Sequence, residues 1–189
     1  QYAYMTHDSQ KVKLVKEILK SKGEDLSHVL IFASSIKSVK EIKKTLNKVG
    51  KKSSEMHSGL TQEQREQTIR DFKNKKIKIL VATDILSRGI DIKGIELVIN
   101  YEVPHDADDY VHRIGRTARA DKTGEAITFI NAKDVKNFME IEKLIEKEVP
   151  KLVLPEGFEK APEYKLLPKK RKKKEKFKKK LPPQNRSVM

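Results

Sequence analysis

The chain has 189 residues, and its 42 Lys and Arg against 27 Asp and Glu give a formal charge of +15 at pH 7. It has no cysteine and no apolar run near the roughly 20 residues that cross a bilayer, so we expect no disulfide bond, no cysteine-bound zinc and no membrane contact. The five histidines lack paired ligand spacing, which argues against a metal site of the protein's own.

The N-terminal ten residues, QYAYMTHDSQ, contain no apolar signal core. We therefore expect a cytoplasmic protein. The chain starts at Gln1 rather than Met, and we expect it to be a piece of a longer protein.

The positive charge is concentrated at the C-terminus. Residues 165–189 hold twelve Lys or Arg and the single acid Glu175, a net +11, which leaves +4 for the preceding residues. Such a lysine-rich run is typical of a segment that is disordered when free, and a polyanion, above all nucleic acid, is its expected partner. We divide the chain into a globular domain at 1–150, a linker at 151–168 and a basic tail at 169–189.

Short apolar strands alternate with amphipathic helices through the globular domain. Helices are predicted, in chain order, at residues 9–22, 36–49, 61–73, 106–116 and from 132 onward. Strands are predicted at residues 29–32, 79–81, 97–99 and 126–129. Thr61 and Gln64 form a capping-box pattern at the start of the third helix. Strands separated by such helices favour an α/β fold with a parallel sheet, in which ligands bind beyond the carboxyl ends of the strands.

Polar residues follow two of the predicted strands. Ser34 and Ser35 come after the first, and their hydroxyl groups can bind phosphate oxygens or cap the next helix. Thr83 comes after the second and can donate to a phosphate, with Asp84 beside it; the alternative is that both only cap the short helix that follows. Asp91, a few residues on, can accept hydrogen bonds from a ribose or begin a turn.

Gln62 and Arg65 share one face at the start of the helix that Thr61 opens. The unpaired N–H groups and the dipole of a helix N-terminus attract phosphate. A backbone phosphate can bind there with Arg65 as its charged partner. The alternative is a solvated surface arginine that binds nothing.

Three arginines, Arg113, Arg116 and Arg119, are spaced by three residues, which predicts one side of a helix or helical turn. Their charges repel one another unless anions come between them. Gly115 lies among them at a cost of ~1 kcal/mol in a helix, which favours another group packing close to the backbone. The alternative is a solvated basic face.

Five segments occur in a fixed order: LIFASS, HSGLTQEQR, VATDILSRGIDI, VINYEVP and YVHRIGRTARA. They resemble motifs IV, IVa, V, Vb and VI of the DEAD-box RNA helicases, across residues 28–130. The opening QYAYMTHDSQKVKLV resembles the entry into the second RecA-like domain of that family. HRIGR favours DEAD-box proteins, because the DEAH and RecQ branches usually begin this motif with Gln. The TARAD variant and the basic tail are most similar to the bacterial RhlE-type branch.

The resemblance implies a RecA-like, three-layer αβα domain with a mostly parallel sheet. In the family this domain closes against an N-terminal RecA-like domain, with ATP and Mg²⁺ in the cleft and RNA across both domains. It implies that Arg116 and Arg119 are arginine fingers at the γ-phosphate and that Asp91 holds the ATP ribose. His112 and Arg113 are implied at the ATP-linked contacts between the domains.

The same resemblance implies an RNA site that contacts phosphates and sugars and reads no bases. Its implied residues are one of Ser34 or Ser35, together with Gln62, Arg65 and Thr83, with Arg88 bridging the RNA and ATP sites. The tail is then interpreted as an RNA tether, with a solubilising segment or a localisation signal as alternatives.

Two residues depart from the family pattern, Ala118 and Ser58, each at a position where the family usually has Gly. The chain also contains no GxxxxGK[ST] loop and no DEAD tetrapeptide. Both are required for hydrolysis in this class, so we expect this chain by itself to be inactive. Separately, we expect the protein to be a monomer. The alternative functions are a non-catalytic RNA-binding module and a DNA-directed helicase, the latter disfavoured by HRIGR.

Overall fold

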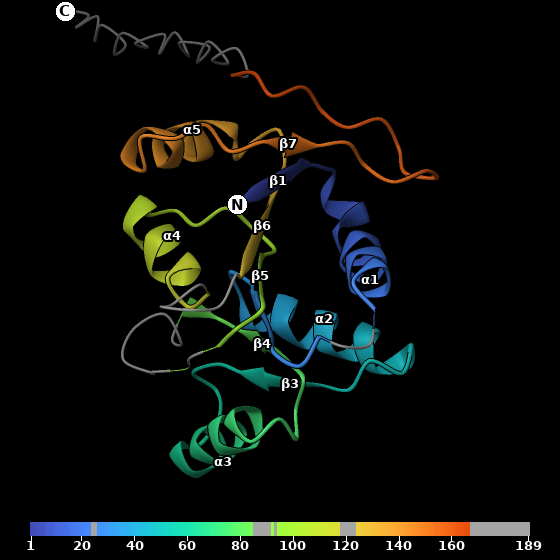
Figure 1. Ribbon diagram of the computed structural model, residues 1–189, viewed down its shortest axis with the longest axis vertical. Helices are drawn as coiled ribbons and strands as arrows, with labels where there is room; N and C mark the ends of the chain where they lie inside the picture. The colour runs from blue at the N-terminus through green and yellow to red at the C-terminus, as the bar shows by residue number, and fades with distance from the viewer. Residues whose placement is uncertain (24–25, 85–91, 93, 118–123, 167–189) are drawn as a thin grey trace, which may run out of the picture.

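The computed structural model describes residues 1–23, 26–84, 92, 94–117 and 124–166 (Figure 1). Within them, seven strands form one sheet in the order β3-β4-β2-β5-β6-β1-β7, and every pairing is parallel. The strands are β1 (Tyr2–Met5), β2 (Val29–Phe32), β3 (Ser53–Met56), β4 (Ile79–Ala82), β5 (Leu97–Asn100), β6 (Glu125–Ile130) and β7 (Lys151–Leu152).

The helices connect these strands and cover both faces of the sheet (Figure 1). They are α1 (Lys11–Ser21), which follows a 3-10 turn at Asp8–Gln10, α2 (Ile36–Lys48), α3 (Gln62–Lys73), α4 (Ala107–Ile114) and α5 (Val135–Leu144). Helices α1 and α2 pack on one face, and α3, α4 and α5 pack on the other. The predicted three-layer α/β fold with a parallel sheet is confirmed.

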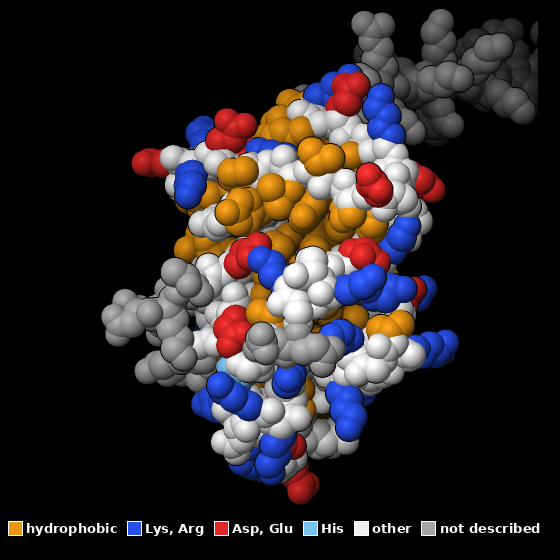
Figure 2. Space-filling model, turned by 45° about the vertical axis from the view of Figure 1, so that its right-hand side comes forward, with side chains coloured by type: hydrophobic (Ala, Val, Ile, Leu, Met, Phe, Trp, Pro, Cys, Tyr) orange, Lys and Arg blue, Asp and Glu red, His pale blue; other side chains and the backbone are white. Residues whose placement is uncertain are grey.

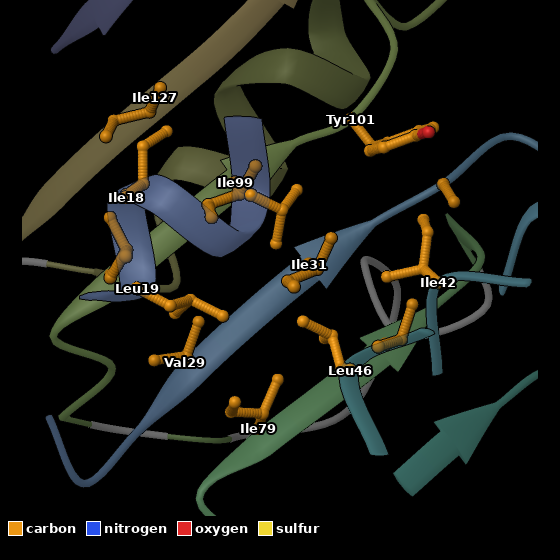
Figure 3. Close-up of a cluster of buried hydrophobic side chains, with 14 of the residues drawn as sticks. Ile18, Leu19, Val29, Ile31, Ile42, Leu46, Ile79, Ile99, Tyr101 and Ile127 are labelled. Atoms are coloured by element: carbon orange, nitrogen blue, oxygen red, sulfur yellow. The ribbon is translucent and has the colours of Figure 1, made fainter. Parts of the chain in front are cut away.

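Strand β2 lies in the middle of the sheet, and all four of its residues are buried. On one face Val29 and Ile31 pack against Ile18 of α1 and Ile42 and Leu46 of α2 (Figure 3). Each such side chain contributes ~1.5–3 kcal/mol when it leaves water. The apolar faces of α1 and α2 are therefore the reason why this face of the sheet carries two helices.

The opposite face is covered by a different set of side chains. Phe72 of α3 packs near Leu30 and Leu80. Toward the other end of the sheet, Tyr110 of α4 meets Phe138 of α5 edge-on, with ring centroids 6.0 Å apart. These aromatic residues fix the three helices on this face.

Three strands were missed by the sequence pattern. β7 has only two residues, and β1, although as long as β2, buries only two of its four residues. β3 is polar because it forms the sheet edge and pairs with β4 alone. Ser53 of β3 is held by Asn47, whose Oδ1 accepts from the Ser53 N–H at 2.7 Å. An edge strand that buries few apolar side chains shows no apolar run in the sequence.

The chain beyond residue 150 continues as part of the fold. The Ala3 N–H donates to the Pro150 carbonyl at 2.9 Å, and β7 then pairs with β1. Tyr164 packs against Phe138, with ring centroids 6.4 Å apart. Residues 151–166, predicted as a linker, therefore extend the sheet and cover α5. The predicted basic tail at 169–189 lies outside the described residues.

None of the helices in the described part of the chain combines the length and the apolar composition needed to span a bilayer.

Candidate functional site at the carboxyl edge of the sheet

Because all strands are parallel, their carboxyl ends lie along one edge of the sheet. In this register Met56, Ala82, Phe32 and Asn100 are neighbours at the ends of β3, β4, β2 and β5. The polar residues after these strands are therefore brought together. They include the predicted Ser34, Ser35 and Thr83, as expected from the α/β pattern.

Arg113 of α4 makes hydrogen bonds to residues at the ends of several strands along this edge. Its side chain is 2% exposed, and its Nε and Nη2 lie 2.7 and 2.6 Å from Asp84 Oδ1. Its Nη1 donates to the Glu102 carbonyl at 3.3 Å and to Asn100 Oδ1 at 3.4 Å. The guanidinium also lies 5.1 Å from the centre of the Phe32 ring. Arg113 thus joins α4 to the ends of β4, β2 and β5.

For Arg113, the expectation that an anion balances its charge is wrong, and so is the alternative of a solvated basic face. A buried arginine needs a carboxylate and further acceptors around its fork, and Arg113 has them inside the domain. Its charge is balanced by Asp84 instead of an incoming anion. From the sequence, Asp84 is expected only to cap the turn after β4.

Helix α4 ends earlier than predicted. Asp106 caps its start by accepting from the Asp108 N–H at 3.0 Å, and Gly115 is its C-cap. A Cβ at Gly115 would lie 3.1 Å from the Val111 carbonyl oxygen. Among the described residues, the atoms nearest to this Cβ all belong to α4 itself, so the tight end of the helix explains the glycine.

The predicted finger Arg116 lies in the turn after α4 and is half-buried. The same turn is attached to the rest of the domain by Thr117, whose hydroxyl donates to the Ile95 carbonyl at 2.9 Å. His112, in the last turn of α4, is exposed. Arg88, Asp91 and Arg119 lie outside the described residues.

Glu102, after β5, was not singled out from the sequence. Its Oε2 accepts from the Ser34 N–H at 3.0 Å and so ties the turn after β2 to the end of β5. Burial raises the pKa of Glu102 above its ordinary value, although the Ser34 hydrogen bond and the charges of Lys11 and Arg113 oppose that shift. The Glu102 carboxylate therefore contacts the turn that holds Ser34 and interacts electrostatically with Arg113 of α4.

The turn after β3 is built around His57, which is 2% exposed. Its Nδ1 accepts from the Gly59 N–H at 3.1 Å. A Cβ at Gly59 would lie 3.2 Å from the His57 ring, so the glycine permits this close approach. The Ser58 carbonyl in the same turn accepts from Arg65 Nη2 at 3.1 Å.

The capping box predicted for α3 is confirmed. Thr61 Oγ1 accepts from the Gln64 N–H at 3.2 Å, and Gln64 Oε1 accepts from the Thr61 N–H at 3.0 Å. Gln62 is exposed and donates to Glu66 Oε1 at 2.9 Å. The first turn of α3 thus presents Gln62 and Arg65 beside the end of β3.

The hydroxyl of Ser35 caps α2 by accepting from the Ser38 N–H at 3.1 Å. This is the alternative role considered for it. The side chain of Ser34 is exposed. Thr83 is half-buried, and its N–H donates to the Met56 carbonyl at 3.0 Å, which continues the sheet past β4.

The edge combines the exposed hydroxyl of Ser34 and the exposed amide of Gln62 with the half-buried guanidinium groups of Arg65 and Arg116, which suits the oxygen atoms of phosphates and sugars. Among the described residues, no group of three or more His, Cys, Asp or Glu side chains is arranged to hold a metal ion.

Comparison with known proteins defines the class. Residues 10–121 match the model of the helicase conserved C-terminal domain, and the chain belongs to this family. The fold and the relatives together make it the C-terminal RecA-like domain of a DEAD-box RNA helicase.

Individual relatives agree with this class. The probable ATP-dependent RNA helicase ddx49 of Dictyostelium discoideum is 39% identical over 149 residues, which cover 79% of this chain and 29% of the relative. A DEAD box protein from Methanococcus jannaschii has a solved structure with a TM-score of 0.75 and 38% identity, covering 81% of this chain and 41% of that chain. The structure of Dbp5 of S. cerevisiae bound to RNA and ADP BeF3 gives a TM-score of 0.73 at 29% identity, covering 80% and 40%. The chain thus spans less than a third of the length of the curated relative.

Proposed function

We propose that the chain is the C-terminal motor domain of an ATP-dependent RNA helicase that unwinds duplexes locally. The observation that carries this proposal is the carboxyl edge, where Ser34, Thr83 and the first turn of α3 lie along the same edge of the sheet as the arginines of α4 and its following turn. The solved structure of Dbp5 is described as bound to RNA and ADP BeF3, which supports both the RNA-binding part and the nucleotide-binding part of the proposal.

In this proposal ATP with Mg²⁺ is bound mainly by an N-terminal RecA-like domain of the same protein. Arg116 and Arg119 approach the γ-phosphate from the present domain and stabilise the charge of the phosphoryl-transfer transition state, a role worth ~10³–10⁵ in rate. Asp91 holds the ribose, and His112 and Arg113 belong to the ATP-linked contacts. Arg113 contributes to these contacts indirectly, by fixing the position of α4, because its guanidinium is bound to Asp84.

RNA is proposed to bind through its backbone. Gln62, Arg65 and Thr83, with Ser34 or Ser35 and with Arg88, contact phosphates and sugars and read no bases. The Ser35 hydroxyl already caps α2, so Ser34 is the better candidate of the two. The lysine-rich tail adds a salt-sensitive RNA tether. A monomer in the cytoplasm completes the proposal.

The test of this function uses the longer protein that contains the N-terminal RecA-like domain. Arg116→Ala is expected to lower its RNA-stimulated ATPase rate by ~10³ or more and to leave RNA affinity within a few-fold. The control is Arg70→Ala, an exposed arginine of α3. Equal ATPase rates for the two variants would overturn the finger role.

The present chain alone is expected to bind RNA without hydrolysing ATP, since it has no phosphate loop. If the longer protein also binds RNA but hydrolyses no ATP, the alternative of a non-catalytic RNA-binding module is correct.

A further inference from the structure

One face of α2 carries a row of four lysines, Lys37, Lys40, Lys44 and Lys48. Their spacings of three, four and four residues place them on a single stripe of the helix. All four are exposed, whereas the opposite side of α2, which includes Ile42, is buried against the sheet. We call these four residues the α2 lysine stripe.

The stripe carries charge that is not balanced locally. Within the described part of the chain none of its four lysines forms an ion pair, whereas their neighbour Lys43 binds Glu55 at 3.1 Å. Glu41 is the one acidic residue of α2. Glu41 lies four residues after Lys37 and three residues before Lys44, but four lysines against this one glutamate leave a local excess of +3, which an anion can neutralise.

The stripe begins at the candidate RNA edge. Helix α2 starts directly after Ser34 and Ser35 at the carboxyl end of β2, and it runs back toward the start of β3 at the opposite edge. From Lys37 to Lys48 the stripe is about 17 Å long at the rise of an α-helix. In Figure 2 Lys and Arg side chains gather in the lower half of the molecule, the half that holds α2, β3 and α3 in Figure 1.

Lysines continue past the end of α2. A cavity of about 280 Å³ at the amino ends of β2 and β4 has Lys52 and Lys75 among its lining residues. The basic surface therefore extends from the carboxyl edge along α2 to the amino edge of the sheet.

We propose that the α2 lysine stripe is a second RNA-backbone site, which holds the strand where it leaves the carboxyl edge. The proposal rests on the RNA-binding function proposed above. At about 3.4 Å per nucleotide of a stacked strand, the stripe matches roughly five nucleotides. Its ammonium groups contact phosphates as point charges and read no bases.

The composition of the stripe favours RNA over an acidic protein. Protein interfaces bury an apolar core, but the exposed residues between the four lysines are polar, Glu41 and Asn47 among them. The stripe also continues directly from the turn that holds Ser34. The site therefore fits a polyanionic strand that is already bound next to it.

The test compares two charge-matched variants of the full 189-residue chain. The first carries Lys37→Gln, Lys40→Gln, Lys44→Gln and Lys48→Gln. The control carries the same change at four exposed lysines in and around α5, namely Lys133, Lys136, Lys143 and Lys147. Both lose four positive charges and keep the basic tail. The control also loses the exposed ion pair of Lys136 with Glu140, which contributes only ~0.3–0.5 kcal/mol to stability, so the position of the lost charge is the main difference. Circular dichroism and thermal unfolding are used to check that both variants fold.

RNA affinity is measured with oligouridylates of about 6 and about 20 nucleotides, a range that brackets the site sizes of single-strand binders, at several salt concentrations. The stripe variant is expected to bind the long RNA at least tenfold more weakly than the unchanged chain at low salt. The slope of log affinity against log salt concentration is expected to become shallower by about 3 for the stripe variant, because each lost phosphate contact with a single strand reduces this slope by about 0.7. The short RNA is expected to bind the stripe variant with nearly unchanged affinity.

Equal losses in the stripe variant and the α5 control would overturn the proposal, because net charge alone would then explain them. So would an equal loss for the short and the long RNA, since the stripe would then belong to the first site. Arg65→Gln tests the proposed function separately and is expected to weaken the binding of both the short and the long RNA. If it weakens neither, the carboxyl-edge RNA site fails, while the stripe is still judged against its own control.

Discussion

The Arg113 guanidinium holds the Asp84 carboxylate from inside the core, with two of its nitrogens 2.6 and 2.7 Å from Asp84 Oδ1. The arginine is 2% exposed, whereas the Asp84 side chain is 43% exposed. The pair joins the last turn of α4 to the end of β4. The position of the turn that carries Arg116 therefore depends on an ion pair made within the domain.

Asp84→Asn is expected to lower the free energy of unfolding by ~1–3 kcal/mol, because it leaves a buried guanidinium with only neutral acceptors. Chemical denaturation measures this loss. In a double-mutant cycle with Arg113→Met, the coupling is expected in the range of ~0.5–3 kcal/mol.

The control for this ion pair is Glu140→Gln, which breaks the exposed pair of Glu140 with Lys136 at 3.3 Å. Its expected effect is only ~0.3–0.5 kcal/mol, as for other exposed pairs on a helix. If Asp84→Asn costs no more than Glu140→Gln, the buried arginine does not depend on Asp84.

The fold could be predicted wherever a segment buries one clear apolar face. The central strand Val29–Phe32 and the helix Ile36–Lys48 have strong patterns, and both were predicted to within a residue. Strand Ser53–Met56 was missed because an edge strand needs few apolar residues, and Lys151–Leu152 because two residues make no pattern. The position of Lys151–Leu152 in the sheet is set by its pairing with β1, which is distant in the sequence.

The site could be predicted in outline, because parallel strands bring their carboxyl ends together whatever their order in the chain. Which charged groups pair with one another within the site could not be predicted. Arg113 was expected to face anions, since the sequence spacing does not show that α4 turns it toward Asp84. The contact of Ser34 with Glu102 joins two loops 68 residues apart, and only the register of β2 and β5 brings them together.

Thr61→Ala is expected to destabilise the chain by ~1 kcal/mol, because it removes the side-chain acceptor of the α3 capping box. It is also expected to weaken RNA binding, since the first turn of α3 presents Gln62 and Arg65. Thermal unfolding and RNA titration measure the two effects. Thr61→Ser keeps the acceptor oxygen and is the matched control; a loss as large in Thr61→Ser would contradict the capping explanation.

Ending the chain after Pro150 is expected to destabilise the domain by at least ~2 kcal/mol, because β7 and the aromatic side chain of Tyr164 are lost from the sheet and from α5. The matched control ends after Leu166 and removes only the basic tail segment. Its unfolding free energy is expected to equal that of the full chain within ~0.5 kcal/mol. Equal stabilities of the two shortened chains would show that residues 151–166 act as a linker.

Glu142 connects α5 to the segment that follows it. It accepts hydrogen bonds from Lys151, from the Tyr164 hydroxyl and from the Val149 N–H. Burial alone raises the pKa of Glu142, but these hydrogen bonds and the charge of Lys151 outweigh it and hold the pKa below its ordinary value of 4.5. The folded state therefore favours the ionised form more strongly than the unfolded chain does.

The sign of the pH dependence follows from this lowered pKa. The stabilisation by Glu142 is fully present above the ordinary pKa of a glutamate and is lost as the pH falls through the lower folded-state value. Glu142→Gln is thus expected to destabilise the chain most at pH 7, by ~1–3 kcal/mol for hydrogen bonds to a charged group. The difference between the two proteins is expected to shrink steadily below about pH 4.5, the range in which a free glutamate becomes protonated. Urea denaturation from pH 7 to pH 3 measures it, with Glu140→Gln on the same helix as a control; a constant difference across that range would show that Glu142 contributes through packing and not through its charge.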